Sequence, residues 1–299
     1  MAPAPGSDLL TKDHRDVLDI VDSLRSKGIG KYIDLPQIIV CGDQSSDKSS
    51  VLEAISGLSF PAKDCLCTRF ATEVVLRRTT NKEPNIAISI RPSPDRTEDE
   101  NKKLLSFKFG GTADDLNLGS VVEEAQKLMG LDNANKVFSK DILRIEKSSS
   151  TQPHLTFVDL PGLFLAGNKN QSVHDAELVQ SLVLSYMKQP RSIILAVVSA
   201  KSEFALQQVT QRVRELDPEG SRTLGLITKP DTLDVGSESE RAYFELAQNQ
   251  DVHLRLGWHV VKNRDFEMRN STKKQRDASE KDFFSRGVWA ALDPDQWML

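Results

Sequence analysis

Residues 38–52 have the sequence IIVCGDQSSDKSSVL, in which an apolar run leads into a polar loop and then into a segment with helical spacing. This order predicts a strand, a loop and a helix, and the loop matches the phosphate-binding pattern G-x-x-x-x-G-K-[ST] at every fixed position but one. Backbone N–H groups of such a loop and of the helix start hold phosphate oxygens. Lys48 would reach the outer phosphates, and the Ser49 hydroxyl would ligate Mg²⁺. The residues predicted to line the phosphate site are Gly42, Asp43, Gln44, Ser45, Ser46, Asp47, Lys48, Ser49 and Ser50.

Asp47 stands where the pattern has its second glycine. Glycine is usual there because the backbone must come close to phosphate, which a side chain would obstruct. Two like charges ~4 Å apart cost several kcal/mol at an effective dielectric of ~20. A loss of ~3–4 kcal/mol turns micromolar binding into near-millimolar binding. The sequence leaves open whether the Asp47 carboxylate repels phosphate, rotates to solvent or pairs with Lys48.

The composition is that of an ordinary globular protein. The chain has 299 residues, of which 38% are hydrophobic and 27% charged, with a net charge of −4. This balance gives no general attraction to nucleic acid, so no nucleic-acid partner is expected. Cys41, Cys65 and Cys67 are too few for a disulfide framework and have poor spacing for zinc, so we expect reduced thiols in a cytoplasmic protein. The sequence contains no secretory signal and no apolar run long enough to span a membrane.

The first 30 residues are expected to form a separate element. Apolar residues recur there at steps of three and four, which predicts an amphipathic helix that ends near residues 27–30. These residues are Leu9, Leu10, Val17, Ile20, Val21 and Leu24. Because this helix precedes the strand at residues 38–42, we assign residues 1–30 to an N-terminal tail and helix, and residues 31–299 to the main domain.

Strand and helix patterns alternate through the main domain. Residues 92–120 are rich in charge, proline and glycine and predict an exposed insertion, with a short strand around Phe107 and Phe109. Residues 148–151 are expected to form a polar connector. The alternation predicts an α/β fold of the P-loop NTPase type, with a mostly parallel sheet and helices on both faces. Strands are expected at residues 72–78, 85–91, 155–159, 192–198, 223–227 and 258–261, and helices at residues 51–57, 121–129, 176–187 and 207–215.

Two further motifs follow strands of this sheet. Residues 159–162 are a D-x-x-G sequence, and residues 228–231 are Thr-Lys-Pro-Asp. Parallel strands bring their carboxyl ends to one edge of a sheet, where open α/β folds bind ligands. At that edge Asp159 is suited to hold Mg²⁺ through water, and the Gly162 N–H to contact the outermost phosphate.

The Thr228–Asp231 motif predicts a choice of base. Lys229 can lie along a purine ring, and the Asp231 carboxylate can accept hydrogen bonds from N1 and N2 of guanine, a donor pair that adenine lacks. Each motif also has a plainer interpretation. D-x-x-G can be an ordinary strand exit, and Asp231 can be a helix N-cap. Agreement of all three motifs in order and context by chance is improbable, and a general P-loop ATPase is disfavoured.

With these motifs, the chain resembles the GTPase domain of the dynamin superfamily over roughly residues 8–290. It is most similar to the myxovirus-resistance-like dynamins, particularly the fungal members. The segments RSIILAV at residues 191–197 and DPEG at residues 217–220 strengthen the resemblance. The resemblance implies that GTP is the substrate and Mg²⁺ the cofactor, and that the N-terminal helix belongs to a three-helix signalling bundle.

The resemblance also implies residue roles. Thr68 matches the switch threonine that binds Mg²⁺ and positions the attacking water, which makes Ser49, Thr68 and Asp159 the metal-binding set. Gln44 would help to place the water, and Ser45 would touch a monovalent cation, Na⁺ or K⁺. The shell of that cation would be completed by the carbonyls of Lys63 and Cys65, where many dynamins carry glycines. The implied catalytic residues are Gln44, Ser45, Lys48 and Thr68, together with Asp159; Asn263 and Thr228 would lie near the nucleotide's sugar and base.

At the level of activity, the resemblance implies Mg²⁺-dependent hydrolysis of GTP by in-line attack of water. Pairing of two GTPase domains in a homodimer would stimulate it, with Glu203 near a position that reaches across the pair. The resemblance implies a large cytoplasmic GTPase that remodels membranes and associates peripherally with organelle membranes. Membrane or microtubule association would come only through a helical stalk and effector segment, which this sequence does not match. The alternative is a pseudo-GTPase, an interaction module whose nucleotide binding is weakened or lost because of Asp47.

Overall fold

The computed structural model describes most of the main domain and three residues before it. The described residues are 17, 20, 24, 36–58, 68–78, 85–112, 117–131, 136–150, 152, 155–165, 171–265, 267–268 and 271–297. Val17, Ile20 and Leu24 are helical, and the rest of the predicted N-terminal helix lies outside the described residues, as do Lys63, Cys65 and Cys67. The division of the chain at residue 30 stays a prediction.

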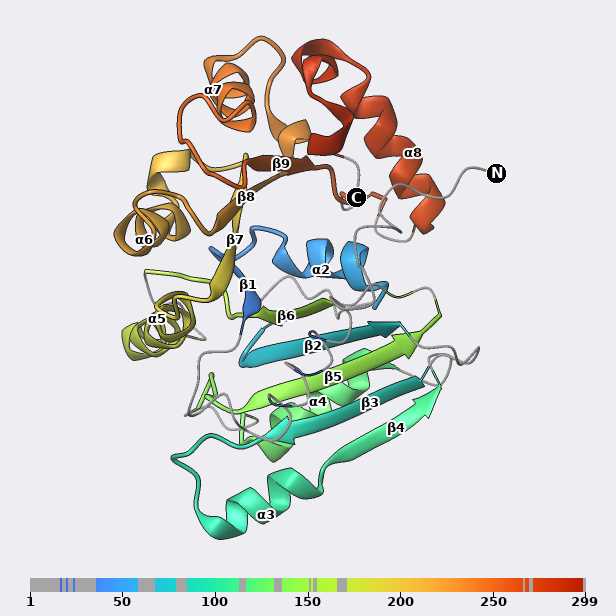
Figure 1. Ribbon diagram of the computed structural model, residues 1–299, viewed down its shortest axis with the longest axis vertical. Helices are drawn as coiled ribbons and strands as arrows, with labels where there is room; N and C mark the ends of the chain where they lie inside the picture. The colour runs from blue at the N-terminus through green and yellow to red at the C-terminus, as the bar shows by residue number, and fades with distance from the viewer. Residues whose placement is uncertain are drawn as a thin grey trace.

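The described residues form one sheet of nine strands (Figure 1). The strands are β1 (Gln37–Gly42), β2 (Ala71–Arg78), β3 (Asn85–Arg91), β4 (Lys108–Thr112), β5 (Ile142–Ser149), β6 (Leu155–Asp159), β7 (Ser192–Ser199), β8 (Thr223–Thr228) and β9 (Trp258–Val261). Their order across the sheet is β4-β3-β5-β2-β6-β1-β7-β8-β9.

The half of the sheet that carries the motifs is parallel. β6, β1, β7, β8 and β9 pair with one another in parallel, so their carboxyl ends meet at one edge. In the other half β2 pairs antiparallel with β6, and β3 pairs antiparallel with β4 and β5, while β2 and β5 are parallel. The prediction of a mostly parallel sheet is confirmed, with antiparallel strands added on one side.

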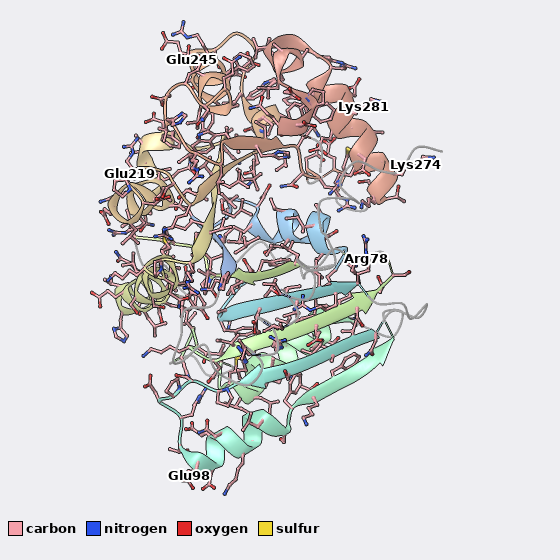
Figure 2. The ribbon with its side chains drawn as sticks, in the orientation of Figure 1. Arg78, Glu98, Glu219, Glu245, Lys274 and Lys281 are labelled. Atoms are coloured by element: carbon pink, nitrogen blue, oxygen red, sulfur yellow. The ribbon has the colours of Figure 1, made fainter. Side chains whose placement is uncertain are left out.

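Helices cover both faces of the sheet, as predicted. The helices are α2 (Lys48–Ser56), α3 (Glu98–Ser106), α4 (Leu118–Leu128), α5 (Val173–Met187), α6 (Gln208–Leu216), α7 (Glu238–Ala247) and α8 (Lys273–Phe284). Side chains alternate along β1, so that Ile39 packs in one core with residues of α5, α6 and α7, and Val40 in the other with residues of α2 and α4. Charged side chains lie at the periphery, for example Glu98 on α3 and Lys281 on α8 (Figure 2).

Two sequence expectations need correction. Residues 148–151 are not simply a connector, because Ser148 and Ser149 belong to β5, a strand that the sequence analysis missed. Charged residues interrupt the apolar run of β5 and hide the strand pattern. One of them, Arg144, is buried and pairs with buried Glu73 on β2 at 3.0 Å, an arrangement that local sequence does not reveal.

The predicted insertion at residues 92–120 is more ordered than expected. α3 begins with a capping box in which Thr97 and Glu100 exchange hydrogen bonds, a signal that the sequence contained. Phe109 lies on strand β4, as expected, but Phe107 does not, because it is the C-cap residue that follows α3. Within the described residues, no helix combines the length and the apolar composition that a bilayer crossing requires.

Candidate nucleotide site

The loop after β1 turns tightly against β7. A Cβ on Gly42 would lie 2.5 Å from the Val197 carbonyl oxygen and 2.6 Å from Ser46 Oγ, so only glycine fits there. Ser46 is buried, and its hydroxyl has no hydrogen-bond partner among the described residues. Gln44 and Ser45 are exposed at the top of the loop. The loop therefore presents polar groups towards the edge of the sheet while its first glycine packs on the core.

Lys48 opens α2 and points back into the loop. Its side chain is buried, and Nζ donates hydrogen bonds to the carbonyl oxygens of Gly42 at 3.1 Å and Asp43 at 2.9 Å. Ser49 and Ser50 follow in the first turn of the same helix, with Ser49 half-buried and Ser50 exposed. The ammonium group thus lies inside the ring of loop residues where phosphate is predicted.

Asp47 takes the left-handed backbone conformation, with φ of 63° and ψ of 26°. Glycine adopts this conformation readily, and aspartate does so more often than most other residues. The Asp47 carboxylate pairs with Lys229 Nζ at 3.0 Å. Of the alternatives that the sequence left open, neither pairing with Lys48 nor rotation into solvent describes the carboxylate, whose partner is Lys229.

Thr68 and Asp159, two of the predicted metal ligands, are in contact. Asp159 ends β6 directly beside β1, and its Oδ2 accepts a hydrogen bond from Thr68 Oγ1 at 3.1 Å. The other oxygen, Oδ1, is buried without a hydrogen-bond partner among the described residues. Burial raises the pKa of Asp159 to about 6, against the opposing effects of Lys48 and the Thr68 hydroxyl. A buried, unpartnered carboxylate oxygen beside a threonine hydroxyl suits Mg²⁺, which prefers hard oxygen ligands.

The D-x-x-G segment is clamped to the phosphate loop. Leu163 N–H donates to the Gly42 carbonyl at 3.1 Å, and Gln44 N–H donates to the Leu163 carbonyl at 3.0 Å. A Cβ on Gly162 would lie 2.9 Å from Gln44 Cα and 3.0 Å from Lys48 Nζ. The segment is therefore not an ordinary strand exit. Leu163 acts through its backbone, so no side-chain pattern could have identified it.

The segment after β8 contacts the same loop from the other side. Thr228 Oγ1 donates to the Ser46 carbonyl at 3.0 Å, and Lys229 Nζ donates to the Ser45 carbonyl at 2.6 Å. Asp231 lies in the short 3-10 helix η4 (Pro230–Thr232) and is exposed. The interpretation of Asp231 as a helix cap is wrong, since Ser237 caps α7.

Residues after β9 lie beside the segment that carries Asp231. Asn263 is buried, and its Nδ2 has no hydrogen-bond partner in the described part of the chain. Lys262, which the sequence analysis did not select, places Nζ 3.6 Å from Asp231 Oδ2. Its backbone N–H donates to Glu280 on α8 at 2.8 Å. The sequence signal for Lys262 was its position directly after β9, a predicted strand whose carboxyl end lies at the same edge of the sheet.

Asp43 was predicted to line the phosphate site, but its carboxylate faces α6. It accepts hydrogen bonds from the backbone N–H groups of Gln208 at 2.9 Å and Val209 at 3.1 Å. Burial raises the pKa of this carboxyl, and those two hydrogen bonds oppose the rise. A contact of Asp43 with phosphate through its backbone stays a prediction.

The described residues hold no cluster of three or more histidine, cysteine or acidic side chains that would bind a metal. Cys41 is a free, buried thiol whose pKa burial raises to about 12, so it is unreactive at neutral pH. The predicted cation shell at Lys63 and Cys65 lies outside the described residues.

Comparison with known proteins identifies a family. The profile of the dynamin family matches residues 38–230. The interferon-induced GTP-binding protein Mx3 of Oncorhynchus mykiss is 34% identical over 251 residues, which cover 84% of this chain and 37% of Mx3. The interferon-induced GTP-binding proteins Mx1 of Equus caballus and Mx2 of Canis lupus familiaris are each 32% identical, over 84% and 94% of this chain and 35% and 37% of their own lengths.

The chain thus spans little more than a third of the length of these relatives. All three are vertebrate proteins, so the expected closeness to fungal members has no support among them.

Proposed function

The chain belongs to the dynamin family, and from this premise we propose that it binds GTP at the carboxyl edge of β1, β6 and β8 and hydrolyses it with Mg²⁺. The observation that carries the proposal is the convergence of three loops. The Leu163 backbone and the Thr228 hydroxyl both hydrogen-bond to the phosphate loop, although they come from segments far apart in sequence. Convergence of this kind is what a phosphate, metal and base site requires.

The residues around the phosphates would act by position and charge. Lys48 would place its ammonium beside the outer phosphate oxygens, and Gln44 would orient the attacking water. Ser49, Thr68 and Asp159 would hold Mg²⁺, which neutralises negative charge on the phosphates when bound. The buried, unpartnered Oδ1 of Asp159 supports this assignment. Ser45 would contribute to a Na⁺ or K⁺ site.

The base would lie between the segments that follow β8 and β9. Asp231 would accept the N1 and N2 donors of guanine, and the methylene stem of Lys229 would lie along the ring. Asn263 supports a polar contact there, because its buried Nδ2 lacks a partner among the described residues. These groups favour guanine over adenine.

Pairing of two such domains is the second part of the proposal. Glu203 directly precedes the short helix η3 (Phe204–Leu206), in which residue Leu206 is 72% exposed. The Asp43 carboxylate joins the phosphate loop to α6, which follows η3 in the chain. A partner that covers this surface would therefore affect the position of the phosphate loop through α6 and Asp43. Membrane remodelling, organelle association or microtubule binding would belong to a full-length protein.

The alternative, a pseudo-GTPase, has one specific observation in its favour. Asp47 occupies the glycine position and holds Lys229, a residue assigned to the base. In that case the domain would serve as a folded interaction module without useful nucleotide turnover.

Isothermal titration of GDP and of a non-hydrolysable GTP analogue, each with Mg²⁺, tests the proposal directly. We expect micromolar binding for both, much weaker binding for ATP and loss of binding in Lys48→Met. Phosphate release from GTP then tests hydrolysis. A folded protein that gives no heat with either guanine nucleotide would favour the pseudo-GTPase, and Asp47→Gly would then decide between the two. Pairing predicts a twofold rise in mass with GDP, aluminium fluoride and Na⁺ or K⁺.

A further inference from the structure

The sheet face that carries α2 is only partly covered in the described part of the chain. A groove of about 550 Å³ lies on this face, and most of the residues that line it are apolar. Leu195 on β7 and Leu226 on β8 belong to its floor, and Val51 on α2 belongs to one wall. Two further lining residues, Ile193 and Leu256, are 40% and 45% exposed, so the groove is open to solvent.

The two faces of the parallel strands differ in the helices that cover them. α5, α6 and α7 contribute to the core on the opposite face, whereas α2 is the only α-helix of the described chain that lines the groove. Figure 1 shows α5 and α6 on one side of β7 and α2 on the other. Parallel strands such as β7, β8 and β9 are normally buried by helices on both faces. Three neighbouring strands span about 10 Å, which is close to the ~10–12 Å diameter of an α-helix.

Residues 17–24 carry the apolar stripe that a helix in this groove would need. Val17, Ile20, Val21 and Leu24 stand at positions i, i+3, i+4 and i+7, so they share one face of a helix. Val17 and Ile20 are 56% and 59% exposed. The chain thus has an apolar stripe and an apolar groove that both face solvent.

The connection between the stripe and the groove is long enough. Residues 25–36 separate the stripe from the start of β1 and can span up to roughly 40 Å when extended. β1 itself contributes Ile38 and Val40 to the groove lining. The segment that ends at the groove is therefore directly continuous with the segment that carries the stripe.

We propose that residues 17–24 dock as a helix in this groove, with the apolar stripe against the sheet, so that the chain covers its own sheet face. The docked helix lies beside α2 and packs against Leu52 and Ile55, which line the groove. This inference goes beyond the proposed function and does not depend on nucleotide binding.

The test measures how fast a thiol in the groove of the whole chain reacts with a maleimide. Ile193→Cys places the thiol at the solvent-exposed part of the groove, in a background with Cys65→Ser and Cys67→Ser. We expect Ile20→Asp, which puts a charge into the stripe, to raise the labelling rate by about tenfold or more. A tenfold change corresponds to ~1.4 kcal/mol, the lower end of what burial of one isoleucine contributes.

Matched controls separate docking from other effects. Ser26→Asp adds the same charge on the opposite face of a helix that continues through residue 26, and it should leave the rate unchanged. Ser181→Cys on exposed α5 should label at one rate in every background. Cys41 is buried, so its labelling would report unfolding of a variant. Should Ile20→Asp unfold the protein, Ile20→Ala takes its place, with a smaller rise in rate expected.

Equal labelling rates of Ile193→Cys with and without the stripe substitution would overturn the inference. A rise with Ser26→Asp as large as that with Ile20→Asp would also overturn it, because charge alone would then explain the effect. Protection of the thiol that increases with protein concentration would assign the groove to a second copy of the chain instead.

Discussion

The Asp43 carboxylate accepts a hydrogen bond from the backbone N–H of Gln208 at 2.9 Å, so the phosphate loop caps a helix that lies far along the chain. Gln207, the N-cap residue of α6, makes no capping hydrogen bond with its own side chain. The second oxygen of Asp43 binds the N–H of Val209 at 3.1 Å. The position of α6 and the shape of the loop are consequently coupled.

We predict that Asp43→Ala lowers the free energy of unfolding by about 1–2 kcal/mol, the usual effect of losing an N-cap. Asp43→Asn keeps one acceptor oxygen and should lose less. Urea unfolding of the two variants measures both values, with exposed Asp251→Ala as the control for a simple loss of charge. If Asp43→Ala is as stable as the unmodified protein, the capping role is wrong.

We expect the buried Asp159 carboxylate to lower the stability of the protein although hydrolysis requires it. Its pKa is about 6 in the folded protein against 3.8 in the reference state, chiefly because burial disfavours the charged form. Only well below pH 3.8 is the group protonated in both states, so that it has no effect on stability there. As the pH rises towards 6, the unfolded state releases the proton first, so the unfolding free energy falls by up to about 3 kcal/mol.

Asp159→Asn should therefore stabilise the metal-free protein at pH 7.5 by about 1–3 kcal/mol, and the gain should shrink towards pH 4. The same substitution should abolish Mg²⁺-dependent hydrolysis, because it removes the charged ligand. Denaturant unfolding of both proteins between pH 4 and pH 8, without Mg²⁺, gives the difference directly. A stability difference that does not change with pH would contradict this account.

Thr68, which donates a hydrogen bond to Asp159, should be needed for turnover but not for nucleotide binding. Thr68→Ala removes a predicted Mg²⁺ ligand and the group that would position the attacking water, so kcat should fall by about 10²-fold. GDP binding should change little, since the phosphate loop and the base motif are untouched. Thr68→Ser retains the hydroxyl and should keep most of the rate. Equal losses in the two variants would indicate that the methyl group, not the hydroxyl, matters.

Asp231 should determine which base is accepted. Its carboxylate takes two donors from guanine, whereas an amide offers one acceptor and one donor. Xanthine carries a carbonyl in place of the amino group of guanine and therefore matches an amide. Asp231→Asn should weaken GTP binding by about 10²-fold or more and strengthen binding of xanthosine triphosphate. Competition titration with both nucleotides measures the exchange, and unchanged preference for GTP would place the base elsewhere.

Much of the site was predictable because its signals are local. The apolar run before Gly42, the lysine after the loop and the motifs at residues 159–162 and 228–231 each depend on a few consecutive residues. Parallel strands place such loops at one edge, so the shared location also followed from the pattern. β5 was not predicted because an arginine such as Arg144 is expected at the surface. Its burial depends on the ion pair with Glu73 on β2, which only the tertiary structure shows.

The sequence alone thus established the α/β class, the phosphate loop and the loops that meet it. It could not establish which charges pair there. Asp47 and Lys229 are 182 residues apart, and Asp43 and Gln208 are 165 apart. They meet because β1, β7 and β8 are neighbours in parallel register. The direction of a side chain such as Asp47 depends on the free energies of competing partners in space, and those partners exist only once the sheet has formed.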